Sequence, residues 1–591
     1  MMKISTKNSY WGVALVVLLF AFFVRFIGLM QTPPALYWEE VALGYDAYSI
    51  LQTGKDHHGN PWPIVAFESF GDWKPSLYFY SLVPFIAIFD LQPWVVRVPS
   101  VLAGMSIVLA VGILSKKVAF LLSLENPNKY GLIGLFLASI STWAIHFSRG
   151  GWEVNLATGL LSWGAVFGLY GVDYATKQKV FKPVYILLSA LLLVLSVYAY
   201  HGTRLVAPLI GVLLAWYWLS ATSLKTFSLK QIWPIITSGC LAVLMIAPIL
   251  LSLQSPQVSQ RFAETSIFST LEVIIESNQA KEALDNTFLS KILYHRYILF
   301  GREILTNYVD HFNLNFLFIS GDSNPRHSTG YGGLLHYQEF IFLLVGIGVI
   351  IHKKQKSGLL LLAWWLVAII PAALTKTTPH ALRILPAMPA MLVITSLGLG
   401  VCFEYVVKVY HSKISILSKI STQNVTHMLT QKSYLFISIA LVSVYIGTFT
   451  FWWRQYWLVY PKQSSSEWQY GYQQMVTEVE MRRGLQSGPV YITREQGRPA
   501  MYYWFYTKTD PVLVQAENAT AKKDQSEFLT FQNISFPNTV HEISIQDDGA
   551  IVASSQAGLE HFQQKNMIIE DLVSVQNQLG KTIWNIYTVK P

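Results

Sequence analysis

The chain has 591 residues, of which 52% are hydrophobic and only 13% are charged, whereas ordinary soluble domains carry about 25% charged residues. This composition argues against a soluble globular protein. Apolar stretches of about 18 residues or more recur along the chain and predict many membrane spans. The formal net charge of +9 falls largely in short loops between these stretches, as the positive-inside rule describes. No nucleic-acid-binding motif accompanies it, so we expect no nucleic-acid partner. Cys240 and Cys402 lie in apolar runs, so no disulfide framework is indicated.

The first apolar run covers residues 11–29 and carries the basic flank of a signal, Lys3 and Lys7, but no small-residue cleavage site follows it. We therefore expect a retained first span. Directly after it, "ALYWEEVALGYDAYS" (35–49) places Glu39 beside Glu40. Carboxylates at a membrane edge are costly and usually line a wet cavity or take part in chemistry. The simpler alternative is that both acids only stabilise the first turn of a helix that starts near Val41.

The same loop, about residues 30–96, supplies further charged residues. "SFGDWKPSLY" contains Asp72 and Lys74, and "VVRVPS" contains Arg97 at the start of the next span. Acids to accept a proton and cations to hold a phosphate are what transfer from a lipid-linked phosphosugar requires. Each cation alone could instead be a membrane anchor. The apolar piece between them (76–89) has fourteen residues and contains Pro84, so we expect an interfacial or re-entrant segment.

Ten further spans are expected after this loop. They cover residues 97–115, 130–147, 154–172, 183–200, 205–222, 232–253, 336–352, 358–374, 381–407 and 434–453. With the N-terminus in the cytoplasm, every strongly basic loop is cytoplasmic. These loops hold Lys116–Lys117, Lys177, Lys179, Lys182, Lys225, Lys230, His352–Lys354 and residues 408–432. The prediction is eleven spans, and a twelfth would reverse every later loop.

The opposite, outer face collects the unusual residues. "HFSRGGWEVN" (146–155) contributes Glu153 and Asn155, and "YHGTR" (200–204) contributes Arg204. A large outer loop, about 254–335, contains "GDSNPRHSTGYGG" with Arg326 and His327, and "TKTTPHALR" (375–383) contains His380 and Arg383. The sequence has no Gly-rich phosphate loop, HExxH motif or Cys/His cluster, and Asp56-His57-His58 alone is weak support for a metal. We therefore expect no cofactor and assign no metal ligands, and a divalent metal is possible but not indicated.

A polar tail, residues 454–591, follows the last span and is expected to lie outside. "SSSEWQYGYQQMVTEVEMRRGL" (464–485) has the pattern of a Ser-capped amphipathic helix. A strand in "PVYITRE", a helix in "RPAMYYWFY" and a strand in "PVLVQ" then alternate, as in a small α/β domain. The predicted organisation is a mainly α, polytopic membrane domain (1–453) with a small extracytoplasmic α/β domain (454–591).

Four motifs together resemble the GT-C membrane glycosyltransferases. They are "YWEEVALGYDAYSIL", "GDWKPSLYFY", "VRVPS" and "SRGGWEVNLA", and the resemblance covers about residues 10–405. It is nearest to the polyprenyl-phosphate-sugar users related to protein O-mannosyltransferases and lipid A aminoarabinose transferases. The family's acidic pair is usually Asp then Glu, so Glu39 stands at the Asp position. Lys74-Pro75 matches a Lys-Pro-Pro motif that ends here in Ser76, and Glu153 matches the second-loop acid.

The resemblance implies an inverting transfer of a hexosyl or pentosyl group from a polyprenyl-phosphate sugar to a hydroxyl acceptor at the plasma membrane. Glu39 or Glu40 would be the base, with Glu39 favoured. Lys74 is the first choice for the donor phosphate, followed by Arg97, Arg204, Arg326 and Arg383. The predicted lining of the sugar and acceptor pocket is Asp72, Glu153, Asn155, His327 and His380. The acceptor, whether lipid, polymer or protein, stays open.

Two other classes of function remain possible from the sequence. A transporter or flippase of lipid-linked saccharides would also be polytopic, but we would expect charged or Gly/Pro-broken helices near mid-membrane and paired half-repeats. A membrane-anchored assembly protein would need only the outer tail. Neither explains why acids and bases gather in the first outer loop.

Overall fold

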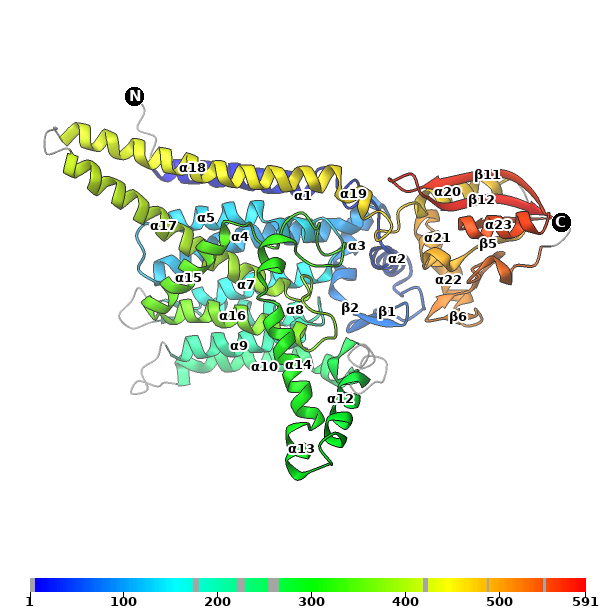
Figure 1. The fold of residues 1–591 in the computed structure, drawn as a ribbon, viewed down its shortest axis with the longest axis horizontal. Helices are drawn as coiled ribbons and strands as arrows, with labels where there is room; N and C mark the ends of the chain where they lie inside the picture. The colour runs from blue at the N-terminus through cyan, green and yellow to red at the C-terminus, as the bar shows by residue number, and fades with distance from the viewer. Residues whose placement is uncertain are drawn as a thin grey trace.

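The computed structural model describes residues 6–173, 180–220, 229–252, 265–417, 423–485, 488–545 and 549–591. Its larger part is a bundle of long helices that run in roughly one direction (Figure 1). These helices are α1 (Thr6–Phe26), α4 (Val98–Leu121), α5 (Pro127–Ile140), α6 (Thr142–Ser148), α7 (Glu153–Tyr170), α8 (Pro183–Val197), α9 (Thr203–Leu219), α10 (Leu229–Ser252), α15 (Glu339–Lys353), α16 (Lys356–Ala373), α17 (Met388–Leu417) and α18 (Gln423–Leu458). The mainly α fold is confirmed, and each expected span overlaps one of these helices, except 130–147, which overlaps both α5 and α6.

Length and composition single out some of these helices as candidate spans. Four are long and apolar enough to cross a membrane, namely Val95–Leu121, Trp233–Ser252, Lys356–Ala373 and Leu385–Val409. The pair α5 and α6 is bent by 57° and qualifies as a fifth if it forms one span. The number of crossings therefore stays a prediction.

Small residues allow the bundle helices to approach closely. Gly346 on α15 and Gly398 on α17 face each other's helices. A Cβ on Gly346 would stand 2.0 Å from the Ile394 carbonyl oxygen, and one on Gly398 would stand 1.9 Å from the Phe342 carbonyl oxygen. Larger side chains would force the two backbones apart, which is the usual reason for glycine between membrane helices.

The two ends of the bundle carry different elements. The C-terminal ends of α4 and α15 lie at the same end of the bundle as the start of α1, and the other end carries α2 (Trp38–Thr53), β1 (Ala66–Ser69), β2 (Asp72–Pro75) and α3 (Leu77–Phe89) (Figure 1). The short strands β3 (Val172–Asp173) and β4 (Val180–Phe181) pair with each other. Lys177, Lys179, Lys225 and residues 254–264 of the predicted large loop lie outside the described residues.

Helix α3 corresponds to the short apolar piece. Its first residue, Leu77, donates its backbone N–H to the Tyr198 carbonyl at the end of α8, over 2.9 Å. Asp90, just after its last turn, pairs with Lys508 of the C-terminal tail. Both ends of α3 thus contact elements at the same end of the bundle.

The large loop forms helices of its own, η3 (Ile267–Ser269), α12 (Leu271–Glu282), α13 (Phe288–Leu293), α14 (Arg296–Asp310) and the π-helix η4 (Asn315–Ile319). Helices α12, α13 and α14 project sideways from the bundle (Figure 1). Two further short turns, η1 (Val95–Arg97) and η5 (Leu385–Ala387), precede α4 and α17.

The tail forms a six-stranded sheet in the order β11-β12-β10-β5-β9-β8. Its strands are β5 (Val490–Ile492), β8 (Thr530–Phe531), β9 (Ile534–Ser535), β10 (Ala550–Ser554), β11 (Ile568–Gln576) and β12 (Thr582–Lys590), and β6 (Lys523–Asp524) pairs with β7 (Glu527–Phe528). Strand β5 is parallel to β10 and β9, and the remaining pairs are antiparallel. The helical elements are α19 (Tyr460–Gln463), α20 (Tyr472–Arg483), α21 (Pro499–Thr507), α22 (Pro511–Glu517), α23 (Gln556–Gln564), η6 (Arg494–Gln496) and η7 (Val540–Glu542).

One tail element differs from its prediction. "PVLVQ" is not a strand but the helix α22, because Asp510 caps it by accepting the Val512 N–H over 2.9 Å and Pro511 occupies the first helical position. Asp before Pro is a strong helix start, and here it outweighs the β preference of the two valines. The predicted helix over 464–485 is shorter, since α20 begins at Tyr472.

Candidate active site

The Glu40 carboxylate accepts four hydrogen bonds at the start of α2. Its Oε1 accepts the Arg97 Nε over 2.8 Å and the Gly151 backbone N–H over 2.7 Å. Its Oε2 accepts Arg97 Nη2 over 3.0 Å and the Tyr37 backbone N–H over 3.2 Å, which completes a helix cap. The side chains of Glu40 and Arg97 are both 0% exposed. Glu40 therefore ties together the first loop, the start of α4 and the second outer loop.

The Arg97 guanidinium likewise has all of its N–H groups hydrogen-bonded. Besides Glu40, its Nη1 donates to the carbonyls of Leu29 and Pro33 over 2.7 and 2.9 Å, and its Nη2 donates to the carbonyl of Ala35. A guanidinium has five N–H groups, and each has an acceptor here. A phosphate contact by Arg97 would require one of these bonds to break.

Glu39 has a different environment, although it is the adjacent residue. It forms an ion pair with Lys74, which lies on β2 opposite Phe67 of β1. The Glu39 side chain is 28% exposed, whereas that of Lys74 is 4% exposed. Consecutive helical residues point about 100° apart. The two glutamate side chains therefore point in different directions, and Glu39 pairs with Lys74 whereas Glu40 pairs with Arg97. The structure thus brings together the two acids and the two bases of the first loop.

The second outer loop contributes Glu153 and Asn155 at the start of α7. Burial, followed by the charges of Glu153 and Glu40, raises the pKa of Tyr37 well above its usual value, so both carboxylates lie near that ring. Asn155 is fully buried, and its amide donates to the Ser100 carbonyl over 2.8 Å and to the Ser100 hydroxyl over 3.1 Å. Glu153 therefore lies near Tyr37, while the Asn155 amide joins α7 to α4 by hydrogen bonds.

Arg326 reaches the same region from the large outer loop. Its guanidinium lies 5.6 Å from the centre of the Tyr37 ring and 5.9 Å from that of Trp38. Its backbone carbonyl accepts the His146 Nε2–H over 2.8 Å, and its Nε is 3.9 Å from a Glu467 carboxylate oxygen. Arg326 thus stands over the two aromatic rings that precede Glu39.

The remaining predicted residues lie on a strand, a helix and a loop, and the hydrogen bonds described below for Asp72 and Arg383 are made within their own segments rather than to the acidic pair. Asp72 begins β2, and its carboxylate accepts the Trp73 N–H over 2.8 Å. Arg204 is the second residue of α9. Arg383 donates to the Thr375 hydroxyl over 2.6 Å and to the Thr377 carbonyl over 3.2 Å, within the last outer loop.

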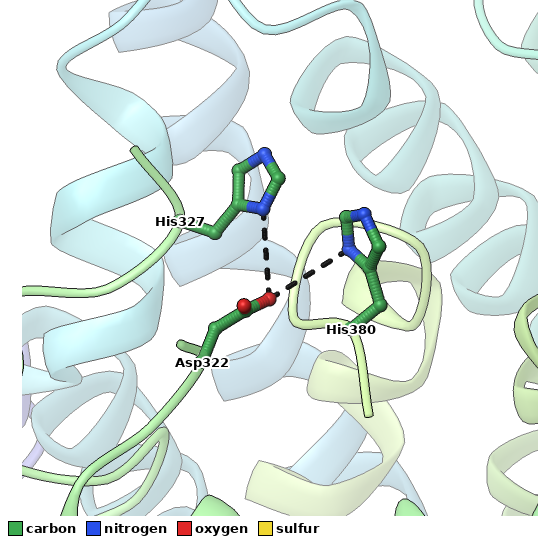
Figure 2. Close-up of side chains that lie close together, drawn as sticks. All are labelled: Asp322, His327 and His380. Atoms are coloured by element: carbon green, nitrogen blue, oxygen red, sulfur yellow. Dashed lines mark ion pairs between the residues drawn. The ribbon is translucent and has the colours of Figure 1, made fainter. Parts of the chain in front are cut away.

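His327 and His380 lie side by side, together with Asp322, which sequence reasoning missed (Figure 2). Burial lowers the pKa of both histidines, so the neutral imidazoles are favoured. Burial alone would raise the pKa of Asp322, but His327, His380 and the Asn324 N–H outweigh burial and lower it. The available signal was an aspartate five positions before His327 in a Gly/Ser/Asn/Pro-rich loop, which by itself indicates only a turn.

The tail also contributes to this site, which the sequence did not reveal. The Tyr502 hydroxyl on α21 donates to the Leu36 carbonyl over 2.9 Å, just ahead of the acidic pair. The Gln469 side chain accepts the Trp38 backbone N–H over 3.3 Å. The loop that carries Glu39 is therefore held by the membrane bundle on one side and by the tail on the other.

Comparison with known proteins gives matches in structure alone, since no family model and no curated sequence matches the chain. ArnT from Cupriavidus metallidurans in the apo state matches with a TM-score of 0.50 at 9% identity, over 99% of this chain and 98% of that chain. ArnT bound to undecaprenyl phosphate gives 0.49 at 12% identity over the same shares. The archaeal oligosaccharyltransferase AglB from Archaeoglobus fulgidus, in complex with an inhibitory peptide and a dolichol-phosphate, gives 0.45 at 12% identity, over 85% and 64%.

The likeness to apo ArnT spans nearly the whole chain, so it includes the tail, which the motif resemblance did not reach. Long apolar helices and this fold together make the chain an integral membrane protein. The chain has the fold of the GT-C membrane glycosyltransferases.

Proposed function

We propose that this protein transfers a sugar from a polyprenyl-phosphate-linked donor to a hydroxyl acceptor at the outer face of the membrane. Glu39 takes the proton of the acceptor hydroxyl as its oxygen attacks the anomeric carbon. The bond from that carbon to the phosphate oxygen breaks, and the polyprenyl phosphate leaves with the electron pair. The displacement inverts the anomeric centre and needs no cofactor.

This proposal is supported by the different surroundings of the two glutamates. A general base must have an oxygen that can reach the substrate's proton. Glu40 is fully buried with both oxygens engaged, whereas Glu39 is partly exposed and has Lys74 as its counterion. The lysine favours the charged carboxylate that a base requires. We therefore assign proton transfer to Glu39 and the positioning of its helix to Glu40 and Arg97.

The donor phosphate is assigned to Lys74 and Arg326. Lys74 lies directly at the base, and Arg326 stands over Tyr37 and Trp38 with a planar guanidinium suited to phosphate oxygens. When the donor binds, Lys74 can pass from Glu39 to the phosphate, which couples donor binding to activation of the base.

The lipid tail of the donor has a candidate groove between α8, α9 and α10. The groove measures about 370 Å³, and its lining is almost entirely apolar, including Leu193, Val197, Ala207, Gly211, Ala242 and Ile246. Arg204 stands one turn before Pro208, which also lines the groove. A polyprenyl chain in the groove would bring its phosphate towards this arginine. Glu153 and Asp72 remain the proposed sugar and acceptor contacts.

The purified chain in sealed proteoliposomes, supplied with a radiolabelled polyprenyl-phosphate sugar and membrane extract as acceptor source, tests the class of function. We expect multiple turnovers, with free polyprenyl phosphate released in step with label transferred. Movement of intact donor across the membrane without its cleavage would instead identify a transporter. Binding of donor without cleavage or movement would identify an assembly protein.

A further inference from the structure

Two outer loops bring three potential metal ligands together. Asp322 and His327 come from the loop before α15, and His380 comes from the loop between α16 and α17 (Figure 2). One ligand atom from each residue lies within 4.8 Å of the others. The three residues are 8%, 8% and 9% exposed, respectively. The ligands are thus gathered in one nearly buried place.

The spacing of these atoms suits a shared metal ion better than direct hydrogen bonds. The Nδ1 atoms of His327 and His380 lie 3.5 and 3.7 Å from the same Asp322 oxygen, Oδ2, and both are buried without a hydrogen-bond partner. Two ligand atoms that each lie about 2.1 Å from a tetrahedral zinc ion are about 3.4 Å apart. An imidazole–carboxylate hydrogen bond is shorter, as between His57 Nδ1 and Asp46 Oδ1, which are 2.6 Å apart.

Neighbouring groups hold the three side chains in position. The Asp322 Oδ2 accepts the Ala381 backbone N–H over 2.7 Å, next to His380. The backbone N–H of His380 donates to His311 Nε2 over 3.2 Å. The His327 ring packs against Trp152, with their centroids 5.6 Å apart. Such outer contacts are what orient ligands around a metal.

We propose that Asp322, His327 and His380 bind a divalent transition-metal ion, with Zn²⁺ as the best match to two imidazoles and one carboxylate. Three protein ligands leave a fourth position for water or for an oxygen of a bound molecule. The ion would join the loop of residues 321–333 to the loop of residues 375–383. Trp152 packs against both His327 and Tyr37, with ring centroids 5.6 and 5.2 Å apart, and so links this cluster to the segment that precedes the acidic pair. The site does not depend on the proposed transferase activity.

The test uses Co²⁺ as a visible probe and Zn²⁺ as its competitor, added to the chelator-treated full-length chain in detergent. We expect one equivalent of Co²⁺ to bind with the strong visible absorption of a tetrahedral site, and Zn²⁺ to displace it. His327→Ala, His380→Ala and Asp322→Asn should each weaken binding by more than about 100-fold, because even the loss of an outer-shell partner costs about 10–100-fold. His57→Gln, which alters another buried histidine paired with an aspartate, should leave binding unchanged.

X-ray absorption of the Co²⁺-loaded wild-type chain gives a second measurement that does not depend on the folding of any variant. Two imidazole ligands and one carboxylate are expected around the ion. The proposal is overturned if wild-type chain binds no stoichiometric metal, if the absorption shows other ligands, or if folded His327→Ala and His380→Ala variants bind as tightly as wild type.

Discussion

Glu39 and Glu40 are adjacent in the chain, but their surroundings give them different chemistry. Glu40 and Arg97 are a buried pair with all hydrogen-bonding groups used. Removing one partner of such a pair typically costs about 3–5 kcal/mol, because the other charge stays buried. Glu39 lies on the same helix but pairs with Lys74 of β2, and its side chain is 28% exposed.

Lys74 provides the first prediction. Lys74→Ala should weaken use of the donor by roughly tenfold to more than a hundredfold, since a hydrogen bond to a charged group is typically worth about 1.5–3 kcal/mol. Lys74→Arg should recover part of this loss because it keeps the charge. The measurement is kcat/KM for a short-chain donor.

Lys508→Ala is the matched control, because Lys508 also pairs with a carboxylate of the first loop, that of Asp90, but is far more exposed. Its removal should leave the kinetics unchanged, as is usual for exposed ion pairs. Wild-type kinetics in Lys74→Ala would show that Lys74 only anchors the loop.

At the scale of elements, the apolar helices and their loops could be predicted from the sequence, because hydropathy and basic residues act locally. The contacts of the first loop could not. The five acceptors around Arg97 include the carbonyls of Leu29, Pro33 and Ala35, and a backbone carbonyl carries no sequence signal. The Asp322–His380 contact likewise depends on how two separate loops pack.

Helix α3 provides the second prediction. It contacts Tyr198 at its first residue, and Asp90 just after its last turn pairs with Lys508. We therefore expect that α3 does not cross the membrane. Asp90→Cys, in a chain whose two native cysteines are replaced, should react with an impermeant thiol reagent on intact cells. Asp90 has a side chain that is 56% exposed, so access is not limited by burial.

The control is a cysteine at Lys353, at the basic end of α15. It should react only after the membrane is permeabilised. The opposite pattern, with Lys353→Cys labelled on intact cells and Asp90→Cys protected, would invert the predicted topology.

At the scale of the whole molecule, the tail and the first loop share one hydrophobic core. Val41 and Tyr45 of α2 and Phe79 of α3 pack in the same cluster as Trp504 and Phe505 of α21. The presence of an α/β tail could be predicted from strand and helix patterns, but this docking could not, because buried aromatic residues do not identify their partner.

The third prediction follows from that shared core. A chain that ends at Gln463 should insert into the membrane but lose transfer activity, because α2 would lose the packing of α21 and the Tyr502 bond to Leu36. Protease sensitivity of the segment 30–96 should rise at the same time. A truncated chain with normal turnover would show that the tail does not support the site.

The most direct test of the central claim compares Glu39→Gln with Glu40→Gln in turnover and in thermal unfolding. Glu39→Gln should lower turnover about a hundredfold or more, in line with lost general-base catalysis, while donor binding is retained and the unfolding midpoint falls less than in Glu40→Gln. Glu40→Gln should lower the unfolding midpoint, because its amide N–H₂ would face the donors of Arg97 and Tyr37. Wild-type turnover in Glu39→Gln, together with a stable but inactive Glu40→Gln, would contradict this assignment of the two residues.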